Sequence, residues 1–188
     1  RVAGLGLVAT SASPVSGSGF PGARVVARSM QPVLSRGAWL TRRLPGPSLP
    51  ASDVAYVLSR LNFGADPDPA EVALTQQVVG DVRAATTGEL LLEILRFDDT
   101  AALRDVHLPA TVVVGTRDVA TPVRHGQALA ESIGGAQLLV LEGCGHMVML
   151  ERPHELDTAL LALAERAAAT PPGGAPGGAP EVRTAPAP

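Results

Sequence analysis

The stretch that decides the fold is residues 108–153, which read LPATVVVGTRDVATPVRHGQALAESIGGAQLLVLEGCGHMVMLERP. Residues 110–116 form an apolar, β-branched run, and a second apolar run follows at residues 136–141. Between them, Thr-Pro at residues 121–122 opens a helix and Gly-Gly at residues 134–135 ends it. Strand, short helix and strand together predict a βαβ unit with two parallel strands and a right-handed crossover.

An acid and a histidine follow the two predicted strands. Asp118 comes just after the first strand, and His146 comes shortly after the second, behind the flexible Gly-Cys-Gly of residues 143–145. Because the carboxyl ends of parallel strands meet at one edge of a sheet, we expect both side chains in one crevice. An acid placed there fixes the tautomer of a histidine and stabilises its protonated form. The spacing therefore predicts that Asp118 and His146 are catalytic.

The remaining segments have simpler patterns. Residues 2–9 are a short apolar run, typical of a strand covered on both faces. Residues 14–103 hold several short helical patterns between Pro-rich breaks, with Asp68 as a helix N-cap, and predict a helical lid. An amphipathic helix follows Pro153. Residues 170–188 contain PPGGAPGGAP without apolar periodicity, which predicts disorder.

Composition narrows the class of protein. The 188 residues, 46% of them hydrophobic, predict one folded domain, and a net charge of −3 gives no reason to expect a nucleic-acid partner. The single cysteine excludes a disulfide framework, and four scattered histidines predict no metal site and no cofactor. Without an apolar run of 18 residues or a visible signal peptide, we expect no transmembrane segment and a cytoplasmic location.

Several of these segments resemble the α/β-hydrolase superfamily. GTRDVATP at residues 115–122 is similar to its acid-bearing loop, G-x-x-D-x-x-x-P, and GCGH at residues 143–146 is similar to its histidine loop. Residues 149–153 resemble the segment that leads into the last helix of that family. Residues 1–10 resemble its sixth strand, and residues 14–103 lie where its members carry a helical cap.

The resemblance implies an α/β fold: the C-terminal part of an α/β-hydrolase parallel sheet with an inserted all-helical cap. Residues 1–13 and 104–169 would form the partial core, residues 14–103 the cap, and residues 170–188 a disordered tail. At most three strands would remain of the sheet. Strands that are apolar on both faces would leave an unpaired edge, so we expect the isolated chain to be partly unfolded or self-associated.

The nucleophile of the family, carried on a G-x-S-x-G elbow, has no counterpart in this sequence. SGSGF at residues 16–20 lacks glycine at both outer positions, and Cys144 fits a tight turn better than a reactive thiol. We therefore expect a C-terminal fragment whose nucleophile and oxyanion hole belong to a missing N-terminal half of the same fold. Alone it would be inactive.

The activity implied for the parent protein is that of a serine hydrolase, with Asp118 and His146 as acid and base and a small hydrophobic acyl or ester substrate. A carboxylate nucleophile would instead make the parent a dehalogenase or an epoxide hydrolase. A Ser elbow is also compatible with a cofactor-free haloperoxidase or a carbon–carbon bond hydrolase. A different class remains open as well, a non-catalytic hydrolase fold that binds a ligand under its lid.

The other candidate residues favour structural roles. His125, early in the helix after residue 122, is expected to face solvent, and His107 to lie in a loop. His154 opens the last helix, where a structural role is expected. Aromatic residues of the cap favour lid packing over an acyl-binding role; they are Trp39, Phe63 and Phe97.

Overall fold

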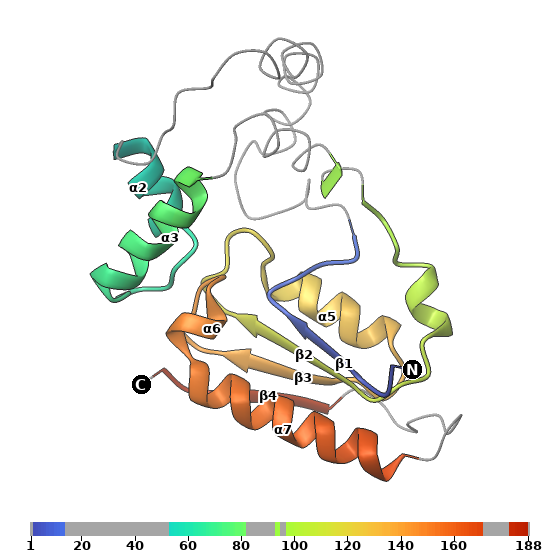
Figure 1. Cartoon of the computed structure of the whole chain (residues 1–188). Coiled ribbons are helices and arrows are strands. Elements are labelled where there is room, and N and C mark those ends of the chain that lie inside the picture. The colour runs from blue at the N-terminus through green and yellow to red at the C-terminus, as the bar shows by residue number, and fades with distance from the viewer. Residues whose placement is uncertain (1, 14–52, 82–92, 95–96, 171–180, 188) are drawn as a thin grey trace.

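The computed structural model describes residues 2–13, 53–81, 93–94, 97–170 and 181–187. Four strands form one sheet in the order β1-β2-β3-β4, and every neighbouring pair is parallel. The strands are β1 (Leu5–Val8), β2 (Ala110–Gly115), β3 (Gln137–Leu141) and β4 (Glu181–Ala185). The first three lie where the apolar runs predict them, and β2 lies between β1 and β3 (Figure 1).

Helices cover both faces of the sheet in the described part of the chain (Figure 1). α5 (Val123–Ser132) is the crossover between β2 and β3, and α7 (Pro153–Ala169) lies on the opposite face. Val112 and Val114 of β2 pack in the cluster that includes α5, and Val113 packs in the cluster that includes α7. All six residues of β2 are buried, which explains why its sequence is apolar without alternation.

The tail departs from the sequence prediction. Disorder was predicted for residues 170–188, and this is wrong over β4, which pairs with β3 in parallel register from Gln137↔Glu181 to Leu141↔Ala185. The limit of three strands is wrong for the same reason. β4 is held by backbone pairing at the edge of the sheet, and four of its five residues are exposed. A strand that buries few side chains needs no apolar periodicity, so its sequence carries no signal of burial.

The described part of the predicted cap contains a helical hairpin, α2 (Asp53–Arg60) and α3 (Pro69–Asp81), as the sequence predicts. Asp68 Oδ1 accepts a hydrogen bond from Ala70 N at 2.8 Å, so the predicted N-cap is present. Val57 and Leu74 are exposed, although their spacing fits an apolar helical face. The buried residues of the hairpin and its turn, among those described, are Ser59, Phe63, Gly64, Val72 and Thr75.

Short elements complete the described chain: the 3-10 helix η2 (Ala102–Asp105) before β2 and α6 (Val148–Glu151) before α7. The predictions for residues 16–20 and for Trp39 concern residues outside the described ranges. None of the helices in the described part of the chain is long and apolar enough to cross a membrane.

Candidate active site

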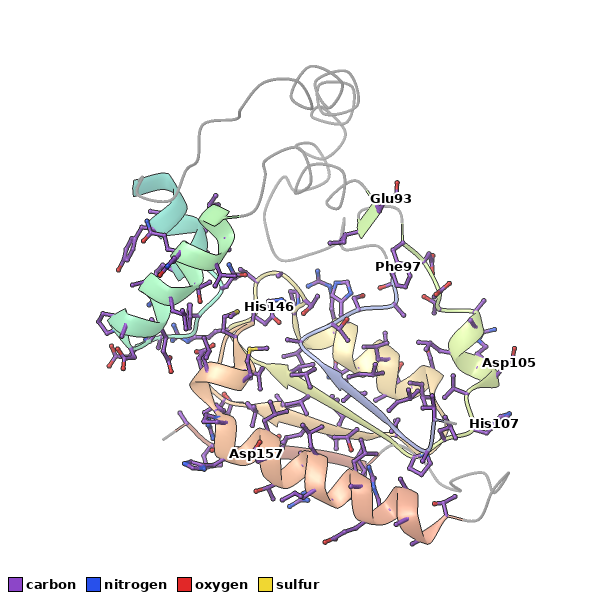
Figure 2. All side chains as sticks on the ribbon, in the orientation of Figure 1. Glu93, Phe97, Asp105, His107, His146 and Asp157 are labelled. Atoms are coloured by element: carbon purple, nitrogen blue, oxygen red, sulfur yellow. The ribbon has the colours of Figure 1, made fainter. Side chains whose placement is uncertain are left out.

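The turn after β2 and the loop after β3 bring Asp118 and His146 together. His146 Nδ1 lies 2.9 Å from Asp118 Oδ2. Figure 2 shows His146 at the edge of the sheet that faces the cap hairpin, far from His107 and Asp157. The two loops therefore deliver an acid and a histidine to the same sheet edge, the position where open α/β sheets bind ligands.

The Asp118 carboxylate is buried and fully engaged by hydrogen bonds. Oδ1 accepts the backbone N–H groups of Ala120 and Thr121, each at 2.8 Å, and Oδ2 accepts the Thr121 hydroxyl at 2.8 Å. Burial acts to raise the pKa of Asp118, but the bonds from His146 and Thr121 outweigh it, so the pKa lies below its ordinary value. Asp118 is therefore a carboxylate at neutral pH.

This arrangement fixes the tautomer of His146. A carboxylate only accepts hydrogen bonds, so Nδ1 carries the proton that it donates to Asp118. In the neutral ring, Nε2 then has a free lone pair. The His146 side chain is 30% exposed, so the ring is reachable from solvent while its acid partner is not. The geometry is that of a general base held by a buried acid.

Gly115, at the end of β2, lets the two loops touch. A Cβ at this position would lie 2.2 Å from the carbonyl oxygen of Cys144 and 2.5 Å from that of Gly145. A hydrogen bond from Arg117 N to the Cys144 carbonyl oxygen, at 2.9 Å, joins the two loops at this point. The first glycine of the G-x-x-D pattern is thus a steric requirement for bringing Asp118 close to His146.

The turn between α2 and α3, residues 61–68 and here called the cap turn, forms hydrogen bonds with the histidine loop. His146 N and Met147 N both donate to the Asn62 carbonyl, at 2.7 and 3.1 Å. Glu151 bridges the same two segments, since Oε1 accepts Gly145 N at 2.9 Å and Oε2 accepts Gly64 N at 2.7 Å. Sequence reasoning missed these contacts. Every residue has a backbone carbonyl, so nothing in the sequence marks that of Asn62 as a contact. Glu151 lies in the segment that resembles the family, but the sequence does not indicate that it bridges two loops.

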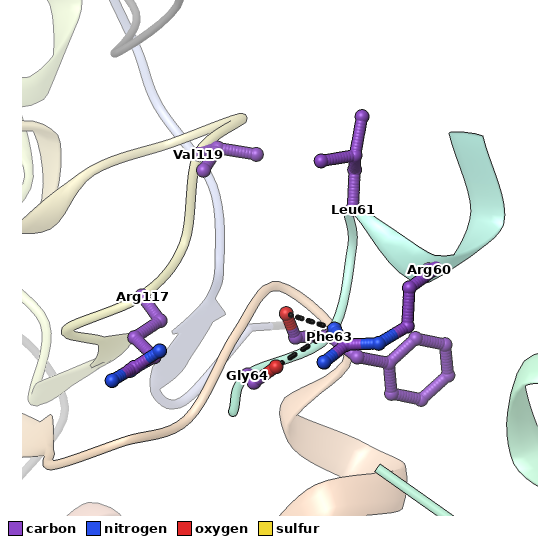
Figure 3. Close-up of a pocket in the computed structure, with 6 residues that line it drawn as sticks. All are labelled: Arg60, Leu61, Phe63, Gly64, Arg117 and Val119. Atoms are coloured by element: carbon purple, nitrogen blue, oxygen red, sulfur yellow. Dashed lines mark hydrogen bonds between the residues drawn. The ribbon is translucent and has the colours of Figure 1, made fainter. Parts of the chain in front are cut away.

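A pocket of about 580 Å³ lies between the acid loop and the cap turn. Figure 3 shows Val119 on the acid loop and Leu61 on the cap turn pointing toward each other across it, with Arg117 lower on the acid loop. The other lining residues are Arg60, Phe63 and Gly64. Of the aromatic candidates in the cap, Phe63 lines this pocket, whereas Phe97 is 48% exposed on a separate loop.

His125 differs from its prediction. It was expected to face solvent, but it is buried, and Nδ1 lies 2.7 Å from Ser11 Oγ and 3.2 Å from Ser13 Oγ. Ser11 and Ser13 belong to the segment that follows β1, so this segment lies against the first turn of α5. Burial is the main cause that lowers the pKa of His125, and nearby Arg124 adds to the effect. His125 therefore links the segment after β1 to α5, and its Nε2 has no hydrogen-bond partner among the described residues.

The environment of Cys144 matches a structural residue. Its thiol is buried, and burial together with the Glu151 carboxylate raises its pKa to about 12. A thiol in such surroundings is a poor nucleophile. His107 and His154 are both exposed, one in a loop and one in the first turn of α7. Among the described residues, no group of three or more His, Cys, Asp or Glu side chains lies close enough to hold a metal ion.

Residues 1–159 match the alpha/beta hydrolase family. The chain belongs to this family. The match extends over the segment before β1 to the middle of α7 and so includes both loops of the site.

Sequence relatives cover parts of the chain. It is 33% identical over 120 residues to the polyketide synthase ThaQ of Burkholderia thailandensis, which is 60% of this chain and 6% of that protein. It is 34% identical over 71 residues to the mouse (Mus musculus) monoacylglycerol lipase ABHD6, which is 36% of this chain and 21% of that protein. The chain thus spans a minor part of the length of these curated relatives.

Solved structures with the same fold match a larger share of this chain than the sequence relatives do. A thermophilic esterase from Thermogutta terrifontis matches with a TM-score of 0.65 and 22% identity, over 89% of this chain and 57% of that one. The enol-lactonase of Burkholderia xenovorans matches with a TM-score of 0.64 and 21% identity, over 88% of this chain and 57% of that one. At these identities the likeness establishes the fold.

Proposed function

We propose that this chain supplies the acid and the base of a serine hydrolase that cleaves an ester or a related acyl bond. The observation that carries the proposal is the 2.9 Å contact between His146 Nδ1 and the buried carboxylate of Asp118. It leaves Nε2 as the proton acceptor at the sheet edge where this family of folds does its chemistry. The names of the relatives, which include a monoacylglycerol lipase and esterases, agree with an acyl substrate.

In the proposed reaction His146 Nε2 removes the proton of a serine hydroxyl as its oxygen attacks the acyl carbon. The imidazolium then returns this proton to the leaving group when the tetrahedral intermediate collapses. Asp118 stays ionised throughout, orients the ring and stabilises the imidazolium. Its ionisation is secured by the hydrogen bonds that lower its pKa.

The nucleophile and the oxyanion hole are proposed to lie on a segment that bears a G-x-S-x-G elbow, which this sequence lacks. A serine there would face His146 Nε2 from the side opposite Asp118. The chain without such a segment is proposed to have no hydrolytic activity, because an acid and a base alone cannot form the acyl-enzyme.

The proposed substrate is small and its acyl part is apolar. The pocket beside the acid loop supports this choice, because Leu61, Phe63 and Val119 line it. Its volume of about 580 Å³ is in the range of small-molecule sites. Arg117 adds a positive charge to one wall of this pocket.

A fluorophosphonate probe, which reacts with activated serines, tests the proposal. The protein tested is one that joins this chain to an elbow-bearing segment. We expect stoichiometric labelling of the elbow serine, loss of labelling in His146→Ala, and unchanged labelling in the control His154→Ala, whose exposed side chain lies on α7. Equal labelling of the His146→Ala and control variants would refute the role of His146. If the probe labels a serine of this chain when no elbow-bearing segment is attached, the assignment of the nucleophile to another segment is refuted.

A further inference from the structure

Residues 181–187, here called the C-terminal strap, reach the loop that carries His146. β4 ends beside this loop, where Glu142 N donates a hydrogen bond to the Ala185 carbonyl at 2.9 Å. Ala185 packs against the buried cluster that contains Cys144 and Val148. Ala187 Cβ lies 3.5 Å from the point that a Cβ on Gly143 would occupy. The strap therefore lies against the first half of the histidine loop.

Arg152 joins the strap to this loop through hydrogen bonds. Its side chain is buried, and Nη2 donates to the Pro186 carbonyl at 2.9 Å while Nη1 donates to the Glu142 carbonyl at 3.2 Å. Nε donates to Glu155 Oε1 at 2.8 Å, so the guanidinium is also anchored to α7. A buried charge of this kind is costly without partners. Three of its donors therefore join the strap, the loop and the last helix at one point.

The histidine loop is thus held on two sides by different segments. The strap and Arg152 form hydrogen bonds with Glu142, whereas the cap turn and Glu151 form them with Gly145 and His146. Between them, Gly143 N donates to Thr116 Oγ1 at 2.9 Å and the Gly143 carbonyl accepts Ala65 N at 3.4 Å. Gly143 has a φ of +74°, a left-handed conformation in which the loop turns sharply. A flexible turn of this kind keeps a single geometry only when both of its flanks are fixed.

We propose that the C-terminal strap is a positioning device for His146: its docking on the edge of β3 fixes the loop in the geometry that brings Nδ1 to Asp118. The consequence for catalysis rests on the proposed function, but the coupling between strap and loop does not. Arg152 acts as the positioning residue that transmits the docked state, and it touches neither the His146 ring nor Asp118 in the described contacts.

The strap is suited to be a detachable element. It is the edge strand of the sheet, and Val182 is 61% exposed, so its docking depends on backbone pairing and a few terminal contacts. A Pro-, Gly- and Ala-rich sequence, residues 171–180, connects it to α7. Such an edge opens more easily than the central strands, because few buried apolar contacts must be broken.

The pairing pattern provides a matched pair of variants. In a strand, the N–H and C=O groups of one residue point to the same side, and alternate residues share that side. Since the Ala185 carbonyl faces β3, the N–H of Arg183 faces β3 and that of Thr184 faces away. Arg183→Pro therefore removes a ladder bond, whereas Thr184→Pro leaves the ladder intact at an edge position that tolerates proline. Arg183→Ala controls for the lost side chain.

Amide hydrogen exchange of the full chain tests the coupling. In Arg183→Pro we expect exchange in residues 138–146 to rise tenfold or more, with no change in β2, and the low-field Nδ1 proton signal of His146 to weaken. Thr184→Pro and Arg183→Ala should stay within twofold of the unmodified chain. Unchanged exchange at residues 142–146 in Arg183→Pro would overturn the proposal. An equal rise in β2 would also overturn it, because the strap would then merely stabilise the whole fold.

These readouts separate the strap from the proposed function. If fluorophosphonate labelling fails while exchange in the loop responds to Arg183→Pro, the hydrolase assignment is wrong and the coupling stands. If labelling succeeds and depends on His146 while Arg183→Pro leaves both exchange and labelling rate unchanged, the hydrolase assignment stands and the strap has no positioning role. Where both proposals hold, we expect the labelling rate of Arg183→Pro to fall about tenfold relative to Thr184→Pro.

Discussion

Replacement of Gly115 by alanine tests how the two loops of the site are brought together. The added Cβ would lie 2.2 Å from the Cys144 carbonyl oxygen, whereas ordinary contact needs about 3.5 Å. The obstacle is backbone, so no side-chain rotation relieves it. The histidine loop must move away from β2 by more than about 1 Å, and the 2.9 Å bond between His146 and Asp118 cannot survive such a shift unchanged.

The expected magnitude follows from this displacement. Overpacking of a tight contact costs about 1–3 kcal/mol of the free energy of unfolding. A displacement near 1 Å at a catalytic group costs about 10²-fold in rate in a protein that contains the nucleophile. Gly134→Ala is the matched control, because an added Cβ there meets nothing within 4 Å. It is expected to change stability by less than about 1 kcal/mol.

Denaturant unfolding of the two variants at the same protein concentration gives the first readout, and the low-field Nδ1 proton signal of His146 gives the second. We expect Gly115→Ala to lose stability and to lose or shift this signal, while Gly134→Ala keeps both. If Gly115→Ala matches its control in stability and in the His146 signal, the loops do not depend on this close approach and the steric account of the G-x-x-D pattern is refuted.

Three further predictions concern the chain itself. With a pKa of about 12, roughly one in 10⁴ Cys144 thiols is ionised at pH 8, so we expect a disulfide reagent to label it orders of magnitude more slowly in the folded chain than in denaturant; equal rates would contradict the burial. Because folding lowers the pKa of Asp118, its contribution to stability is present above the unfolded value of about 3.9 and is lost as the pH falls through the lower folded value. The stability difference between the unmodified chain and Asp118→Asn, measured by thermal unfolding from pH 7 to pH 3, should therefore shrink below about pH 4, and growth of this difference on acidification would contradict the pKa direction. The outer edge of β1 is unpaired in the described sheet, so we expect concentration-dependent elution in size-exclusion chromatography, and a concentration-independent monomer would argue against an open edge.

Much of the fold follows from local patterns in the sequence. The β-branched run at β2 and the capping signals at Asp68 and residues 121–122 depend on neighbours in the chain, so they predict strands and helices correctly. The approach of Asp118 to His146 follows from topology alone, because parallel strands end at one edge.

The features that sequence reasoning missed depend on contacts between distant segments. β4 forms because β3 offers an open edge, and nothing in residues 181–185 signals burial. The helical periodicity of α3 identifies a helix but not the face that its neighbours cover, so Leu74 is exposed and Thr75 is buried. His125 is buried because Ser11, 114 residues away in sequence, meets it at the end of β1.

We propose that Asp118 holds His146 as the base of a hydrolase. The most direct test of this claim is the turnover of a short-chain p-nitrophenyl ester by Asp118→Asn, in a protein that joins this chain to an elbow-bearing segment. Asparagine would keep the shape of the site but favour the wrong tautomer of His146, so we predict a loss of about 10³- to 10⁴-fold in kcat. A loss of less than about tenfold, with folding intact, would show that the acid lies elsewhere.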